Sequence, residues 1–147
     1  MSSIQATLYD VLVEALEKTI LGYFKTIPYI VSVVLFGSQV RQTANKESDV
    51  DIAVLCERAH VPDIMTLIEW REDIAALVHK NVDLVCLNTA SPIIGMQVHK
   101  NGKILMVKHQ RAYAEYQMYL FTDYAELKEL RAPMEKDILK RKFYDQS

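Results

Sequence analysis

Two aspartates, Asp49 and Asp51, are separated by one valine at the start of an apolar run, DVDIAVLC. Side chains alternate across a β-strand, so in a strand both carboxylates point to the same face. Two carboxylates on one face repel each other and are costly to desolvate without a compensating charge. A divalent cation supplies that charge, and Mg²⁺ suits oxygen ligands of this kind. The pattern therefore predicts a metal site on this strand.

A third aspartate, Asp83, lies near the start of a later apolar run, NVDLVCL. If the two runs form neighbouring strands in a suitable register, three carboxylates meet at one corner. Such a cluster matches two-metal nucleotidyl transfer, in which paired ions stabilise the attacking and leaving oxygens. In that chemistry Asp83 binds the ion on the nucleophile side and helps to deprotonate a hydroxyl, while Asp49 and Asp51 hold both ions and the phosphates.

A Gly-Ser pair, Gly37 and Ser38, directly follows another apolar run, VVLF. Glycine lets the backbone approach a ligand closely, and Ser38 offers a hydroxyl and an amide to a phosphate oxygen. Arg41 either reaches a phosphate or pairs with a nearby acid, and the two readings weigh about equally. Gly-Ser alone is a common turn, and a D-x-D on a strand edge is often only solvated. Their combination with Asp83 favours a nucleotide-binding site.

The surrounding sequence predicts strands alternating with helices. A first amphipathic helix should begin near Ile4 and fade near Gly22, Pro62 and Asp63 suit the start of a helix that ends near His79, and a helical tail begins near Gln110, with Pro133 as a break or kink. The predicted strands cover residues 29–36, 49–56, 82–87 and 104–107. This order indicates an α/β (α+β) layer structure: a small mixed sheet, packed helices and a helical C-terminal tail.

Composition narrows the class of protein. The 147 residues suit a single domain, 1–147, and the net charge of -2 argues against stable binding of nucleic acid through a broad basic surface. No apolar stretch is long enough to span a membrane, and the N-terminus lacks the layout of a signal peptide, so we expect a cytoplasmic protein. Cys56 and Cys86 each end an apolar run, and we expect buried, reduced thiols.

The motif residues Gly37, Ser38, Asp49, Asp51 and Asp83 resemble the core motif of the nucleotidyltransferase superfamily related to DNA polymerase β. The short length, SDVDIAVL and the Tyr-rich tail look more specifically like the minimal nucleotidyltransferases, or MNT proteins. In bacteria and archaea these commonly act as antitoxins paired with a HEPN-domain ribonuclease toxin. The resemblance implies a polymerase β-like nucleotidyltransferase fold.

For function, the resemblance implies a protein adenylyltransferase that moves AMP from ATP, with two Mg²⁺ ions, to a tyrosine hydroxyl of the HEPN toxin. Asp49, Asp51 and Asp83 would be the catalytic and metal-binding residues, and Gly37, Ser38 and Arg41 the nucleotide-binding residues. Members often read G-S-x-A-R-G, whereas Gln42 replaces the second glycine here.

Two alternatives to a protein adenylyltransferase remain open. One is a non-catalytic antitoxin that neutralises its toxin by binding and masking it. The other is a small-molecule nucleotidyltransferase of the aminoglycoside-modifying kind. Such enzymes usually carry a further helical domain, and the residues after Asp83 are too few for a large one.

The tail, residues 110–147, carries an aromatic and aliphatic stripe at spacings of three and four residues: Tyr113, Tyr116, Tyr124, Leu120, Leu127 and Leu130. Most such stripes pack against the protein's own core. Tyrosine is also favoured at surfaces that another protein buries. The tail is therefore either core packing or a partner interface.

Overall fold

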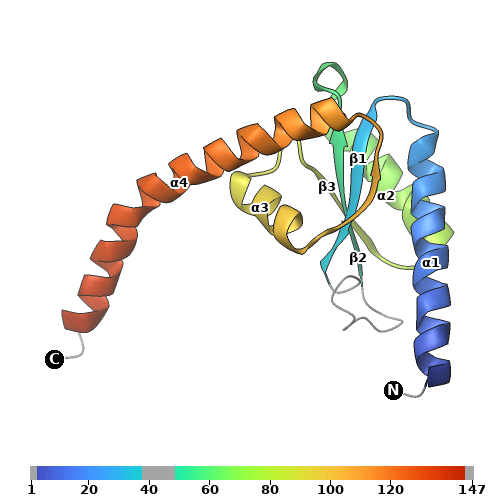
Figure 1. Cartoon of the computed structure of the whole chain (residues 1–147), viewed down its shortest axis with the longest axis horizontal. Helices are drawn as coiled ribbons and strands as arrows, with labels where there is room; N and C mark the ends of the chain where they lie inside the picture. The colour runs from blue at the N-terminus through green and yellow to red at the C-terminus, as the bar shows by residue number, and fades with distance from the viewer. Residues whose placement is uncertain (1–2, 38–48, 145–147) are drawn as a thin grey trace.

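The computed structural model describes residues 3–37 and 49–144, which form a four-stranded mixed sheet with helices on both faces (Figure 1). The strand order is β3-β2-β1-β4. Strand β1 runs antiparallel to both β2 and β4, whereas β2 and β3 are parallel. The elements, in chain order, are α1 (Ser3–Lys25), β1 (Ile30–Phe36), β2 (Val50–Cys56), the short 3₁₀ helix η2 (Arg58–His60), α2 (Ile64–Val78), β3 (Val82–Cys86), α3 (Pro92–Asn101), β4 (Lys103–Val107) and α4 (Gln110–Tyr144).

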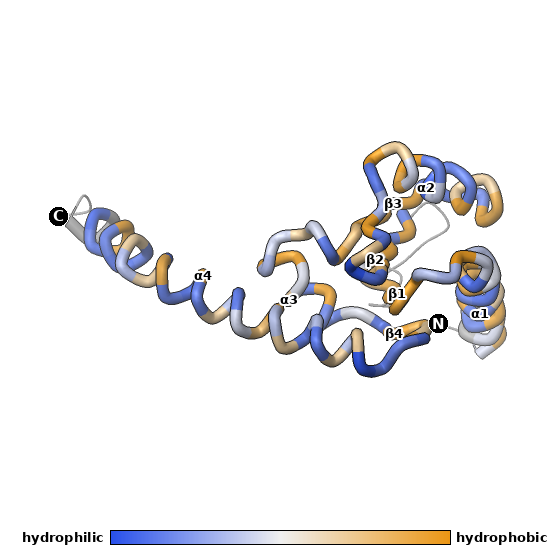
Figure 2. The backbone as a smooth tube through the Cα atoms, turned by 90° about the horizontal axis from the view of Figure 1, so that it is seen from above, coloured by the Kyte–Doolittle hydropathy of each residue, from blue (hydrophilic) through white to orange (hydrophobic). Residues whose placement is uncertain are grey.

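The sheet separates two hydrophobic clusters. Helices α1 and α2 lie on one face, and α3 and α4 lie on the other (Figure 2). The larger cluster joins Phe24 of α1, Trp70 of α2 and Ile52 of β2. Ala53 and Leu55 point the other way, into the cluster under α3 and α4. The predicted alternation along β2 is therefore confirmed, and it places Asp51 on the face that α3 and α4 cover.

Helix α1 continues through Gly22 to Lys25, although the sequence pattern predicts that it fades near Gly22. A glycine in a helix costs about 1 kcal/mol relative to alanine. Ile20 and Phe24, on either side of Gly22, are both fully buried against the sheet. Burying two such side chains outweighs the propensity of one glycine, since each contributes about 1.5–3 kcal/mol.

Two further helical features differ from the sequence-based expectation. Of the predicted break or kink at Pro133, the break is wrong, because α4 is continuous through this residue, and the ribbon of α4 curves along its length (Figure 1). A proline inside a helix removes one backbone hydrogen bond, and a carbonyl on an exposed helix turns to water instead. Helix α3 was not predicted, yet its start carries ordinary signals: the Ser91 side chain accepts a hydrogen bond from the Ile94 amide, and Pro92 occupies the first turn.

Both cysteines, Cys56 and Cys86, are buried and free, as the sequence predicts. The Asn88 side chain joins the end of β2 to the loop after β3. Its amide nitrogen donates to the Cys56 carbonyl at 2.8 Å, and its oxygen accepts from the Cys56 amide at 2.9 Å. Among the helices described, none is long and apolar enough to cross a membrane.

Replacing Phe24 with alanine should lower the free energy of unfolding by about 3–5 kcal/mol, because the side chain is fully buried and its loss leaves a cavity. Urea denaturation followed by tryptophan fluorescence measures this change, since Trp70 packs edge-on against Phe24. Phe121→Ala is the matched control: Phe121 is 43% exposed, so its removal should cost much less. Equal losses from the two substitutions would contradict the assignment of Phe24 to the core.

Candidate active site

The parallel pairing of β2 with β3 sets Asp51 directly beside Asp83. Residues paired in neighbouring strands point to the same face, so both carboxylates lie on the side of the sheet that α3 and α4 cover. The two side chains are close enough to share a hydrogen bond. The two runs thus form neighbouring strands in the register that brings Asp83 beside Asp51.

Burial raises the pKa of Asp51 above its usual range, and the charges of Asp83 and Asp49 raise it further. Asp83 and Asp49 are exposed, whereas Asp51 is partly covered. Desolvation and like charge both disfavour a second negative charge at the same place. The corner is therefore unfavourable for a second negative charge, and a bound positive charge would relieve the repulsion between Asp51 and Asp83.

Gly37 closes the site from the neighbouring strand. It directly follows β1, whose last residue, Phe36, pairs with Asp51. The Gly37 backbone has a φ of 79°, a conformation that residues with a Cβ rarely adopt. A Cβ built at this position would overlap Asp51 Oδ2. Only glycine allows the chain to pass this close to the Asp51 carboxylate.

The chemistry of these donors fits a divalent cation. Carboxylate oxygens are hard ligands suited to Mg²⁺, and a cation would offset the negative charge that Asp51 and Asp83 bring together. Within residues 3–37 and 49–144, no three histidine, cysteine, aspartate or glutamate side chains form a complete metal-binding group. Asp51 and Asp83 are thus the close pair, and Asp49 adds charge from the residue before β2. Ser38 and Arg41 lie outside the described residues.

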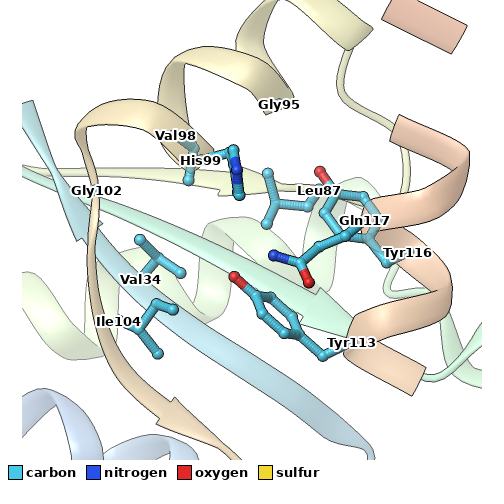
Figure 3. Close-up of a pocket in the computed structure, with 10 residues that line it drawn as sticks. All are labelled: Val34, Leu87, Gly95, Val98, His99, Gly102, Ile104, Tyr113, Tyr116 and Gln117. Atoms are coloured by element: carbon cyan, nitrogen blue, oxygen red, sulfur yellow. The ribbon is translucent and has the colours of Figure 1, made fainter. Parts of the chain in front are cut away.

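Neither of two hollows in the surface is lined by the carboxylates. A small cavity of about 90 Å³ lies between β1, α3 and α4, where Tyr113 and Gln117 reach toward Val34 (Figure 3). A larger one of about 360 Å³ lies near the end of β2 and includes Asn88 and Tyr119. Asp51 and Asp83 lie at the beginnings of β2 and β3, so the carboxylates and the larger hollow occupy opposite ends of these strands.

The first part of the tail stripe is core packing. Tyr113 and Tyr116 pack against the hydrophobic cluster under α3 and α4, and burial raises the pKa of both phenols, that of Tyr116 to about 12. Leu120 is buried against α3 at Gly95, where an added Cβ would lie 2.6 Å from Leu120 Cδ1. Leu130, by contrast, is 73% exposed. The core interpretation therefore holds for the first part of the stripe and fails for Leu130.

The fold is a mixed sheet between two helical layers, and Gly37 contacts one of two paired aspartates. This arrangement indicates a nucleotidyltransferase. Residues 18–111 match the family model described as polymerase beta, nucleotidyltransferase. The chain belongs to the polymerase β nucleotidyltransferase family.

The chain is also similar in sequence to a named member of this family. The chain is 38% identical over 79 residues to the protein adenylyltransferase MntA of Shewanella oneidensis, a match that covers 54% of this chain and 55% of that protein. The match thus spans about half the length of that curated relative.

Two solved structures are similar over most of their length. One is a toxin-antitoxin with AMP-PNP, at 30% identity and a TM-score of 0.74, covering 84% of this chain and 98% of the other. The second contains a tri-AMPylated Shewanella oneidensis HEPN toxin in complex with an MNT antitoxin, at 27% identity and a TM-score of 0.72, covering 86% and 98%.

Replacing Asp51 with asparagine should stabilise the free protein at neutral pH. The pKa of Asp51 is raised on folding, so the folded state holds this proton more tightly than the unfolded state does. Ionised Asp51 therefore lowers the free energy of unfolding above its folded pKa. The penalty disappears as the pH falls below the usual aspartate value of 3.8.

Urea midpoints of the wild type and Asp51→Asn, measured from pH 7 down to acid, test this expectation. The gain from the substitution should be largest at neutral pH and shrink on acidification. Asp10→Asn, on an exposed position of α1, is the control and should leave the midpoint unchanged. A destabilised Asp51→Asn at pH 7 would show that the carboxylate is not under electrostatic strain.

Proposed function

We propose that this chain is an antitoxin that transfers AMP from ATP to a tyrosine hydroxyl of a cognate HEPN-family ribonuclease toxin. The observation that carries the proposal is the Asp51–Asp83 pair, held against Gly37 in a polymerase β nucleotidyltransferase fold. The similarity to MntA and to complexes containing AMP-PNP and an AMPylated HEPN toxin supports the nucleotide and the partner.

The residues take separate roles in this proposal. Asp49, Asp51 and Asp83 would hold Mg²⁺, two ions in the fully loaded site. When bound, these ions neutralise the triphosphate and stabilise the attacking and leaving oxygens. Gly37 would give the phosphates close access to backbone amides, Ser38 would contact a phosphate oxygen, and Arg41 would either contact a phosphate or pair with a nearby acid.

The transfer step uses Asp83 as the proton acceptor. It takes the proton from the tyrosine hydroxyl as the phenolic oxygen forms a bond to the α-phosphorus of ATP. The bond between that phosphorus and the oxygen bridging to the β-phosphate breaks, and pyrophosphate leaves with the electron pair. Asp83 suits this role because it is exposed at the surface, where an acceptor from another protein can reach it.

An AMP group on a tyrosine near a ribonuclease site adds bulk and negative charge, which opposes the binding of RNA. Residues 1–147 would work as one minimal nucleotidyltransferase domain, with part of the tail, 110–147, as partner interface. We place the reaction in the cytoplasm, in keeping with the free thiols of Cys56 and Cys86.

Intact-mass spectrometry of the proposed HEPN toxin tests the proposal directly. After incubation with ATP, Mg²⁺ and the wild-type chain, the toxin should gain whole AMP units. Asp49→Ala/Asp51→Ala should lower the rate by about a thousandfold or more, since it removes the groups that hold the triphosphate charge. EDTA should stop the reaction with the wild type.

The same samples separate catalysis from masking. A toxin that gains no mass, yet is neutralised equally by the wild type and by the double variant, would mean that inhibition works by binding alone. A mass gain on an added aminoglycoside, with none on the toxin, would instead support the small-molecule enzyme.

Gly37→Ala should lower the rate of AMP transfer by about a hundredfold while the sheet stays folded, because a Cβ at this site displaces the Asp51 carboxylate. The initial rate and the thermal unfolding temperature should be measured on the same preparation. Gly22→Ala is the control, since a Cβ there meets no atom within 4 Å. Full activity of Gly37→Ala would remove Gly37 from the site.

A further inference from the structure

We propose that the projecting half of α4 is the docking surface for the acceptor protein, and that it receives an apolar helical face of that protein. The surface is formed by Leu127, Leu130, Met134 and Ile138, here called the projecting stripe. This inference rests on the proposed function, because it names where the modified protein binds.

The first half of α4 is anchored to the body of the molecule. Leu120 packs against α3 at Gly95, and Phe121 meets the His99 ring edge-on with 4.9 Å between ring centroids. Lys100 Nζ lies 5.9 Å from the centre of the Tyr124 ring. These contacts set which side of α4 faces the sheet.

The same side of α4 continues past the last of these contacts. Residues seven apart fall on nearly the same side of an α-helix, so Leu120, Leu127 and Met134 are aligned. Leu120 is buried and Leu127 half-buried, but every residue from Lys128 to Arg141 is exposed. Met134 is 61% and Ile138 56% exposed. The projecting stripe is therefore a packing face that no part of residues 3–37 and 49–144 covers.

The position of the projecting stripe indicates that the acceptor protein binds it. Helix α4 lies on the sheet face that carries Asp51 and Asp83, since Ala53 and Leu55 of the same strand pack beneath it. Its projecting half extends away from the sheet and bends down on the side on which β1 ends and β2 begins (Figure 1). A protein that brings a tyrosine to the carboxylates approaches this face and passes alongside the stripe.

Among the described residues, further exposed apolar side chains lie on α2, with Ile64 and Met65, and on α1, and both helices cover the opposite face of the sheet (Figure 2). Ile4, Leu8 and Leu12 are exposed on α1, which belongs to the opposite face of the sheet. A partner bound there would not be directed to Asp83. The projecting stripe thus combines an uncovered apolar face with access to the carboxylates. Aliphatic side chains spaced three and four residues apart on a helix fit the ridges of a second helix.

Met134→Glu/Ile138→Glu tests the proposal, with Lys136→Glu as the control. Lys136 is exposed, and its helical position is on the opposite side of α4 from the stripe. All three chains carry Asp51→Asn when binding to the HEPN protein is measured by calorimetry, so that no transfer occurs. The stripe variant should bind about a hundredfold more weakly, as expected for loss of central interface residues, and Lys136→Glu should bind like its parent.

With the wild-type carboxylates restored, the stripe variant should show a raised KM for the HEPN protein and an unchanged kcat in the mass assay. Circular dichroism of each variant reports whether α4 keeps its helix content. Unchanged affinity in the stripe variant overturns the docking proposal, as does a fall in kcat at constant KM. If the stripe variant instead alters only self-association of this chain, in sedimentation without the HEPN protein, a second copy covers the stripe.

Different results would refute the proposed function and the proposed docking surface. A wild-type chain that binds the HEPN protein through the stripe but adds no AMP refutes the transfer reaction and supports the surface. A wild-type chain that adds AMP, alongside a stripe variant of equal affinity, refutes the surface and supports the reaction.

Discussion

The repulsion between Asp51 and Asp83 is the constraint around which the rest of the sheet is arranged. Their strands run parallel, so the chain between them must cross over the sheet, and α2 makes that crossing. The register then fixes the two carboxylates side by side, and Gly37 completes the corner from the antiparallel neighbour β1. Segments from β1, β2 and β3, which lie far apart in the sequence, therefore meet at the pair of carboxylates.

Burial of apolar side chains on the opposite face of the sheet offsets the repulsion between Asp51 and Asp83. Ile20, Phe24 and Ile74 are fully buried there under α1 and α2, and the rings of Phe24 and Trp70 meet edge-on. The face that carries the carboxylates is packed mainly toward the other end of the strands, by α3 and the first half of α4. Stability and chemistry are thus divided between the two sides of one sheet, and between the two ends of the strands.

Much of the fold follows from local patterns in the sequence. The β-branched runs predict all four strands, and alternation in β2 correctly separates Asp51 from Ile52. The pairing of Asp51 with Asp83 could be stated only as a condition, because strand register depends on tertiary packing. The extent of α1 beyond Gly22 depends on burial of Phe24, which propensity does not include. The sequence pattern does not predict α3, although Ser91 and Pro92 mark its start, because the helix is only ten residues long and carries Gly95 in its interior, a residue that disfavours helices.

Asp83 also affects how the edge of the sheet can pair with other molecules. Strand β3 is the outermost strand beside β2, and it is only five residues long. An outer strand offers unpaired amides and carbonyls to the strands of other molecules, and charge and short length both discourage such pairing. The short length of β3 and the exposed charge of Asp83 both disfavour edge-to-edge pairing at this margin. The acid that would accept a proton in catalysis helps to keep neighbouring molecules apart at high concentration.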